Sequence, residues 1–311
     1  MVSSTALLNS IIFAMCSIAA CVVLRDPPEA SIEAVQQTHI SGLLAKAKTA
    51  CQNPDIQSAF RIDPAWAHYA LSDLLIGLGL MYGGRNRSHA VSYACGNHSF
   101  AGEWPQSIYC ELRREFPDDP SAELRSHRLL EIVKRRIGNT SKNKVAVHIR
   151  MGDVIDDSPD SVEDMLTSPT YFYGNKQPWN RYVMPLEHYR YVEARLTPGQ
   201  PVILVGAPHA PDFKERMQPF YKSCLYTYAI ASYFEQKGYN VQLRIGYLPD
   251  DDFAFLVNSQ HLFPSGGRYG KLAARLVLLN GGRAHFTPFS GRSAPPRTRA
   301  HSQTQSNRTP E

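Results

Sequence analysis

The feature of the sequence that most constrains the fold is its second half, in which short apolar segments alternate with helical stretches. The expected strands occupy residues 144–149, 201–206, 239–245, 262–263 and 283–287, and 201–206 has the composition of a buried strand. Helices are expected between them, over 186–196 and 226–237, from the acidic triplet at 250, and from about 271. This alternation predicts an α/β fold with a parallel, doubly wound sheet.

The first of these strands ends in the segment 148–153, His-Ile-Arg-Met-Gly-Asp. Because side chains alternate along a strand, His148 and Arg150 emerge on the same face at the carboxyl end, where open α/β sheets bind their ligands. The guanidinium of Arg150 suits a phosphate, Gly152 permits a tight turn, and Asp153 is placed to accept backbone N–H groups of that turn. These residues predict an anionic ligand. The alternative is a plain surface ion pair between Arg150 and Asp153.

A second group of informative residues lies nearer the C-terminus. The acidic triplet 250–252 opens an apolar helix, and the short strand at 262–263 leads into Ser265-Gly266-Gly267 and a further helix. Backbone N–H groups of Ser265, Gly266 and Gly267 at a helix N-terminus would form an anion-binding cradle. A simple N-cap and turn is the other interpretation of the same residues.

Together the two segments resemble the signature peptides of the fucosyltransferase superfamily, which comprises the α-1,2-, α-1,6- and protein O-fucosyltransferases. In that family a His-x-Arg-x-Gly-Asp peptide follows a Val-rich strand, and a later peptide combines an acidic residue, a short strand and a small-residue turn that opens a helix, as at 144–153 and 250–279. In family members a Ser usually follows the aromatic residue after the small-residue turn. This sequence departs from that pattern, because Gly270 and Lys271 follow Tyr269. Its Gly-rich segment 83–87 is only loosely similar.

The resemblance implies a GT-B-like glycosyltransferase whose Rossmann-type C-terminal domain takes GDP-fucose as donor. Arg150 would then stabilise the departing diphosphate, with His148 against the nucleotide. One Asp of the triplet, expected to be Asp252, would accept guanine N–H groups. The other interpretations of the triplet are an Asp-x-Asp metal clamp and an acidic first helical turn. No metal and no further cofactor is expected, and the general base stays unassigned.

The N-terminal residues 1–24 form an apolar segment without a charged side chain, about long enough to cross a bilayer. We interpret this segment as a signal anchor that places the rest of the chain in the lumen of the Golgi or another secretory compartment, as the resemblance implies. Arg25 follows the segment and no Lys or Arg precedes it, which is the reverse of the positive-inside rule. A cleaved signal peptide is the alternative.

The net charge of +5 comes largely from the C-terminal segment 291–311, which holds four Arg and one Glu. That segment is rich in Ser, Pro, Gln and Thr and is expected to be disordered. The rest of the chain is nearly neutral and shows no zinc-finger spacing or basic recognition helix. We therefore expect no nucleic-acid partner.

Four of the six cysteines lie beyond the apolar N-terminal segment, at Cys51, Cys95, Cys110 and Cys224. In a lumenal compartment they could form two disulfides with three possible connectivities, of which the shortest loop pairs Cys95 with Cys110. No Cys or His spacing indicates a structural zinc site.

The sequence thus predicts four regions: a signal anchor at 1–24, a smaller, mostly helical or α/β acceptor-side domain at 25–142, a nucleotide-sugar-binding domain at 143–290, and a disordered tail at 291–311. The predicted activity is inverting transfer of fucose from GDP-fucose to a hydroxyl of a glycan or glycoprotein. The alternatives are a metal-dependent nucleotide-sugar transferase and a catalytically inactive, membrane-anchored binding relative. The residues expected to bind substrate are His148, Gly152, Asp153, Asp252, Ser265, Gly266 and Gly267, with Arg150 as the catalytic residue.

Overall fold

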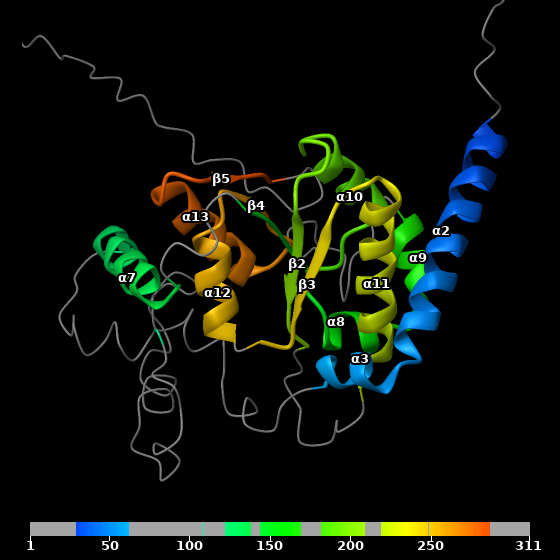
Figure 1. Cartoon of the computed structure of the whole chain (residues 1–311), viewed down its shortest axis with the longest axis horizontal. Helices are drawn as coiled ribbons and strands as arrows, with labels where there is room; N and C mark the ends of the chain where they lie inside the picture. Colours follow the sequence, from blue (N-terminus) through cyan, green and yellow to red (C-terminus); the bar gives the residue numbers. More distant parts are fainter. Residues whose placement is uncertain are drawn as a thin grey trace, which may run out of the picture. The chain divides into compact units, whose positions relative to one another are not determined.

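The structure is a computed structural model, and it describes residues 29–61, 108, 122–137, 144–168, 182–208, 219–247 and 249–286 (Figure 1). The chain divides into two compact units, Met1–His39 and Ile40–Glu311. Within the described residues, the second unit contains all strands and all candidate site residues, and the description below concerns that unit.

A five-stranded parallel sheet forms the centre of this unit, with the strand order β3-β2-β1-β4-β5. Its strands are β1 (Val145–His148), β2 (Val202–Gly206), β3 (Val241–Ile245), β4 (His261–Phe263) and β5 (Arg283–Ala284). All four pairings are parallel, which confirms the predicted α/β fold with a parallel sheet. From β1 the chain adds β2 and then β3 on one side of β1, and it then adds β4 and β5 on the other side. The direction in which strands are added therefore reverses between β1 and β4. In such sheets the ligand crevice lies at the carboxyl ends of those two strands.

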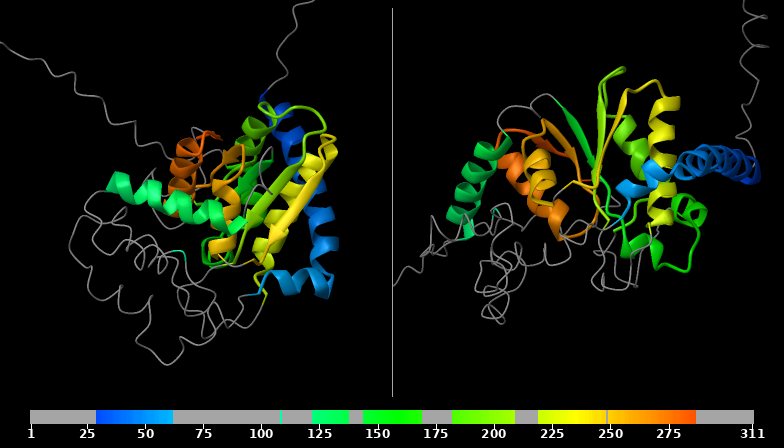
Figure 2. Two further views of the ribbon diagram at one scale, coloured as in Figure 1. Left: turned by 60° about the vertical axis from the view of Figure 1, so that its left-hand side comes forward. Right: turned by 60° about the horizontal axis from the view of Figure 1, so that its bottom comes forward.

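Helices cover both faces of the sheet (Figure 2). The helices, in chain order, are α2 (Glu29–Cys51), α3 (Pro54–Ala59), α7 (Ala122–Ile137), α8 (Asp153–Asp156), α9 (Val162–Thr167), α10 (Leu186–Glu193), α11 (Tyr221–Gln236), α12 (Pro249–Val257) and α13 (Arg268–Leu279). The predicted helices at 186–196, 250 and 271 correspond to α10, α12 and α13, with ends shifted by one to three residues. The four-residue α8 and the six-residue helices α3 and α9 were not predicted.

The two faces of β1 enter two separate hydrophobic cores. Val145 and Val147 pack in the core formed with α10 and α11, whereas Ala146 packs in the core formed with α7, α12 and α13. Residues 40–60 and 129–133 also contribute buried side chains to these cores. The sheet is therefore covered partly by segments that precede it in the sequence by many residues.

Helix α11 begins at Tyr221, five residues before the predicted start at 226. Its own sequence supplies no side-chain cap. Instead, the carboxylate of Asp156 accepts the backbone N–H groups of Lys222 (2.8 Å) and Ser223 (3.1 Å). A helix end whose N–H groups are satisfied from another segment carries no local sequence signal, because the capping residue is 66 positions away.

A buried disulfide joins Cys51 at the end of α2 to Cys224 in α11, with the two Cα atoms 6.0 Å apart. This bridge belongs to the one connectivity of the three that also contains the pair Cys95–Cys110. Both of those cysteines lie outside the described residues, so the second pairing stays a prediction.

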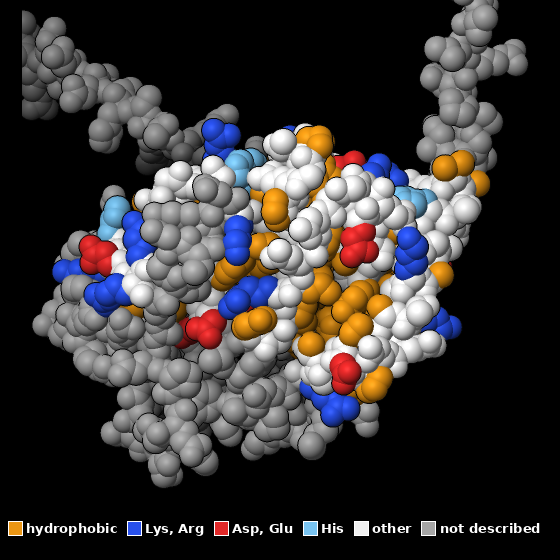
Figure 3. Space-filling model, viewed as in Figure 1, with side chains coloured by type: hydrophobic (Ala, Val, Ile, Leu, Met, Phe, Trp, Pro, Cys, Tyr) orange, Lys and Arg blue, Asp and Glu red, His pale blue; other side chains and the backbone are white. Residues whose placement is uncertain are grey.

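The segments 1–24, 83–87 and 291–311 also lie outside the described residues, so the predicted anchor, the Gly-rich segment and the predicted disorder of the tail are not tested. Among the helices that the structure describes, none is long and apolar enough to cross a membrane. On the face of the unit shown in Figure 3, Lys and Arg side chains are interspersed with Asp and Glu. The described part of this face therefore presents mixed charge.

Candidate functional site at the carboxyl ends of β1 and β4

The two predicted segments meet at the reversal point of the sheet. The Ser265 hydroxyl, just after β4, lies 2.8 Å from Nδ1 of His148, the last residue of β1. Both side chains are buried, and the two residues are 117 positions apart in the sequence. The contact brings the His-x-Arg-x-Gly-Asp peptide and the Ser-Gly-Gly turn into one site.

Burial lowers the pKa of His148 to about 3, and the positive charge of Arg150 contributes in the same direction. The imidazole is therefore neutral at physiological pH, with one ring nitrogen as donor and the other as acceptor. Its ring centroid lies 5.2 Å from that of Tyr269, which in turn lies 5.4 Å from Phe253. These ring contacts connect His148 at the end of β1 to the helices α13 and α12.

Arg150 bonds to its own loop. One terminal nitrogen, Nη1, donates to the carbonyl of Met151 at 2.6 Å, and Nη2 donates to Asp153 at 2.7 Å. The ion pair considered in the sequence analysis is therefore present, with about one fifth of each side chain exposed. The carboxylate of Asp153 bonds to this guanidinium and not to the backbone N–H groups of the turn, which corrects the role expected for it.

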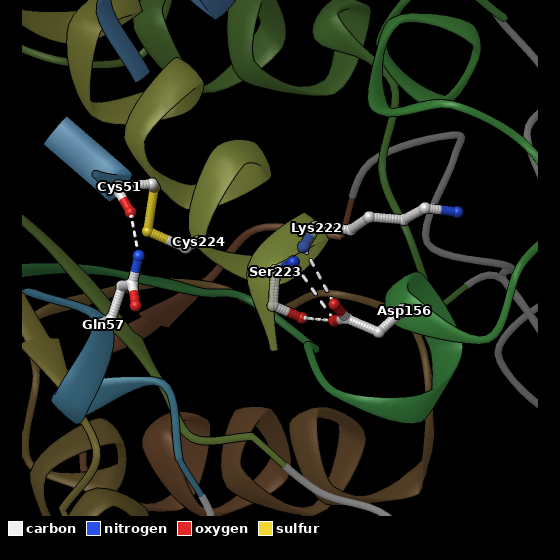
Figure 4. Close-up of a disulfide and its surroundings, with 6 residues drawn as sticks. All are labelled: Cys51, Gln57, Asp156, Lys222, Ser223 and Cys224. Carbon is white, nitrogen blue, oxygen red and sulfur yellow. Dashed lines mark hydrogen bonds between the residues drawn. A yellow bond between two sulfur atoms is a disulfide. The ribbon is translucent and has the colours of Figure 1, made fainter. Parts of the chain in front are cut away.

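Gly152 adopts the tight-turn conformation expected for it, with φ of +89°, which side-chain-bearing residues rarely adopt. Its N–H donates to the Ser223 hydroxyl at 2.8 Å inside the protein, so this donor is directed at α11 and not toward the crevice. Ser223, Lys222 and Asp156 form a network beside the disulfide (Figure 4). Burial raises the pKa of Asp156, against the opposing effect of the hydrogen bonds from Ser223 and Lys222.

The Ser265-Gly266-Gly267 turn opens the twelve-residue helix α13, as predicted. Gly267 has φ of +96°, and a Cβ there would lie 2.9 Å from the Tyr182 ring. Gly270, where the resembling family usually has Ser, lies equally close to its neighbours: a Cβ would meet the Ser265 carbonyl oxygen at 2.9 Å and His148 Nδ1 at 3.2 Å. The missing side chain at 270 therefore allows α13 to pack tightly against the end of β1.

The three carboxylates of the acidic triplet do not act together. Asp250 accepts the backbone N–H of Ile108 at 2.7 Å, while Asp252 accepts Nε of Arg244 at 2.7 Å. The second oxygen of Asp252 is buried and has no hydrogen-bond partner among the described residues. Burial raises the pKa of Asp252 to about 7, although Arg244 lowers it. Within the described ranges, no group of three or more His, Cys, Asp or Glu side chains could hold a metal ion.

Arg244 lies between two aromatic rings, with its guanidinium carbon 3.9 Å from the centroid of Tyr247 and 4.9 Å from that of Phe255. Tyr247 is about half exposed. The residue that follows Asp252 is Phe253, which reaches His148 through Tyr269. An exposed aromatic ring, a cation held against it and a carboxylate oxygen without a partner among the described residues therefore lie together where β3 ends and α12 begins. Arg244 could not be singled out from its sequence context, since a lone Arg at the end of a strand gives no specific signal.

No protein-family model, curated protein or solved structure matches this chain. Its fold and site define it as a doubly wound α/β protein with buried polar side chains gathered at the reversal point of a parallel sheet.

Proposed function

We propose that the chain is a GT-B-type glycosyltransferase related to the fucosyltransferases, anchored in a secretory-pathway membrane such as the Golgi. It binds GDP-fucose at the carboxyl ends of β1 and β4 and transfers fucose, with inversion, to a hydroxyl of a glycan or glycoprotein. The observation that carries the proposal is the hydrogen bond between His148 and Ser265, because it joins the two peptides of the resemblance at the place where this fold binds ligands.

The transfer breaks the bond between the anomeric carbon and the β-phosphate oxygen while the acceptor oxygen forms a new bond to that carbon. Negative charge develops on the departing GDP, and preorganised donors stabilise that charge. In the proposed enzyme Arg150 donates to the β-phosphate, and the N–H groups of the 265–267 turn at the α13 N-terminus supply a second set of donors. Transfer also releases the proton of the acceptor hydroxyl, and the group that receives this proton is not assigned.

The base subsite is proposed on Asp252. Guanine presents two adjacent N–H donors on its Watson–Crick edge, which a carboxylate can accept. Asp252 already accepts one hydrogen bond from Arg244, and its second oxygen is the buried acceptor without a partner among the described residues. Buried polar atoms are nearly always satisfied in native proteins, so an unsatisfied carboxylate oxygen supports a ligand donor at this position.

The test measures GDP binding to the full chain by calorimetry or thermal shift in EDTA, with ADP and UDP as comparison nucleotides. We expect GDP to bind best, because adenine and uracil lack the paired donors that Asp252 would accept. Arg150→Ala is expected to weaken GDP binding about tenfold or more, since a hydrogen bond to a charged group contributes about 1.5–3 kcal/mol.

Arg190→Ala is the matched control, because Arg190 also forms an i,i+3 ion pair, with Glu187 on α10. Its removal should leave GDP affinity unchanged. Wild-type protein that binds no GDP, or binds it equally well without Arg150, would refute the proposal. Binding that appears only after manganese is added would favour the metal-dependent alternative. Release of fucose from GDP-fucose then separates an active transferase from an inactive binding relative.

A further inference from the structure

A closed ring of hydrogen bonds holds the glycine of the His-x-Arg-x-Gly-Asp peptide. The Gly152 N–H donates to the Ser223 hydroxyl at 2.8 Å, and the Gly152 carbonyl accepts the N–H of Asp156 at 2.9 Å. The ring closes where the Ser223 hydroxyl donates to the Asp156 carboxylate at 2.5 Å. Both polar groups of Gly152 are thereby fixed by two residues that lie 67 positions apart.

The bond from Gly152 to Ser223 bears directly on Arg150. The N–H of Gly152 and the carbonyl of Met151 belong to the same planar peptide group and point in opposite directions. That carbonyl is the acceptor for Nη1 of Arg150, at 2.6 Å. Because glycine at φ of +89° has no side chain to resist rotation, the hydrogen bond to Ser223 fixes the direction in which the Met151 carbonyl points. One rigid peptide thus connects Ser223 to the guanidinium.

The position of Ser223 is itself firmly held. The Asp156 carboxylate accepts the N–H groups of Lys222 and Ser223, and Nζ of Lys222 donates to the carbonyls of Ser158 and Asp160 at 2.6 and 3.1 Å. The next residue, Cys224, is bonded to Cys51 (Figure 4). Ser223 is fully buried, so its hydroxyl is shielded from bulk solvent.

We infer that Ser223 and Asp156 are positioning residues for the anion site: they orient the peptide between Met151 and Gly152 and thereby hold the Arg150 guanidinium ready for an anionic ligand. The choice of GDP as ligand rests on the proposed function. Neither residue contacts the ligand, and each acts only through the loop.

The test compares Ser223→Ala with Ser161→Ala. Like Ser223, Ser161 lies at the start of a helix and its hydroxyl donates to an Asp carboxylate, here that of Asp164 in the capping box of α9. Unlike Ser223, it makes no hydrogen bond to Gly152. Both variants are expected to lower the melting temperature. Only Ser223→Ala is expected to weaken GDP binding, about five- to tenfold, because the guanidinium is no longer preorganised. Ser223→Thr, which keeps the hydroxyl, should restore most of the affinity.

A double-mutant cycle separates positioning of Arg150 from general loosening. In the Arg150→Ala background, Ser223→Ala should cause no further loss of GDP affinity, because the residue that Ser223 positions is already absent. Additive losses in the double variant, or unchanged affinity in Ser223→Ala alone, would overturn the inference while leaving the proposed function intact.

Hydrogen exchange at the Gly152 amide supplies a readout that needs no ligand. We expect this amide to be protected in the wild type and in Ser161→Ala, and to exchange much faster in Ser223→Ala. If the wild type binds no GDP, the proposed function fails, but this exchange rate still tests the positioning role. An amide that stays protected without the Ser223 hydroxyl would contradict it.

Discussion

Replacing Asp252 with Asn is expected to remove a pH dependence of stability that this carboxyl group imposes on the chain. Asp252 is 3% exposed, one of its oxygens has no hydrogen-bond partner among the described residues, and its neighbour Asp251 adds a like charge. Burial is the main reason that the pKa rises to about 7 from an ordinary value of 3.8, with Arg244 opposing the rise. The ionised form of Asp252 is therefore costly in the native state.

The direction and size of the effect follow from these two pKa values. Between about pH 4 and pH 7 the native state keeps a proton that the unfolded chain has released, so the free energy of unfolding falls as the pH rises. The stabilisation is fully present below pH 4 and is lost as the pH passes through 7. For the values of 3.8 and about 7, the loss between pH 5 and pH 8 is about 2–3 kcal/mol. In Asp252→Asn this loss disappears.

Other buried groups make the pH profile of the wild type a composite. Burial lowers the pKa of His148 and of His188 to about 3, so the native state loses stability as the pH falls below the ordinary histidine value of 6.5. This contribution is common to the wild type and the variant. The difference between their unfolding free energies therefore isolates Asp252.

The assay is equilibrium unfolding by urea at pH 5, 6, 7 and 8 for the wild type, Asp252→Asn and Asp251→Asn. The last variant makes the same change of charge one position away, at a side chain that is partly exposed. We expect Asp252→Asn to gain about 2–3 kcal/mol on the wild type between pH 5 and pH 8, whereas Asp251→Asn should follow the wild type closely. A difference between Asp252→Asn and the wild type that is the same at pH 5 and pH 8 would refute the reasoning.

Three further predictions follow. The double variant Cys51→Ser, Cys224→Ser should lose up to about 5 kcal/mol of unfolding free energy, because the bridge closes a loop across 173 positions, and urea unfolding measures this loss. Gly270→Ala should destabilise the chain by about 1–3 kcal/mol, seen as a lower melting temperature, since its Cβ would lie 2.9 Å from the Ser265 carbonyl oxygen. Under the proposed function, GDP affinity should rise up to about tenfold per pH unit between pH 5 and pH 7, because guanine donors favour the ionised form of Asp252, and calorimetry on Asp252→Asn should show no such rise.

The fold was predictable where local patterns carried it. The strands β1 and β2 are short apolar runs, and the alternation of side chains along β1 agrees with Val145 and Val147 in one core and Ala146 in the other. Features that depend on distant residues were not predictable. The start of α11 is capped by Asp156 from another segment, and loop-closure entropy grows too slowly with length for spacing alone to identify the partner of Cys51.

The candidate site shows the same division. The sequence identified His148 and Ser265 separately, and the structure brings them together. Ser223 could not be identified from the sequence. A Ser inside an apolar helix looks the same in sequence whether its hydroxyl holds a loop or is simply buried. The role of Asp153 was also wrong in detail, because the nearby guanidinium of Arg150 is a stronger partner for a carboxylate than neutral backbone N–H groups.

The departures from ordinary folding rules in this unit suggest where function lies. A stable core needs neither a buried carboxylate oxygen at Asp252 that has no partner among the described residues nor a glycine at φ of +89° held by the Ser223 side chain from another helix at Gly152. A well-packed apolar residue in place of the Asp252 and Arg244 pair would often be as stable or more so. Gly152 lies four residues after the end of β1 and Asp252 belongs to the helix that follows β3, so both lie on the side of the sheet where parallel strands end. The cost at Asp252 has an explanation if a ligand at that edge supplies the missing hydrogen bond, and the conformation of Gly152 has one if it holds Arg150 for an anion; the proposed nucleotide supplies donors for Asp252 and acceptors for Arg150.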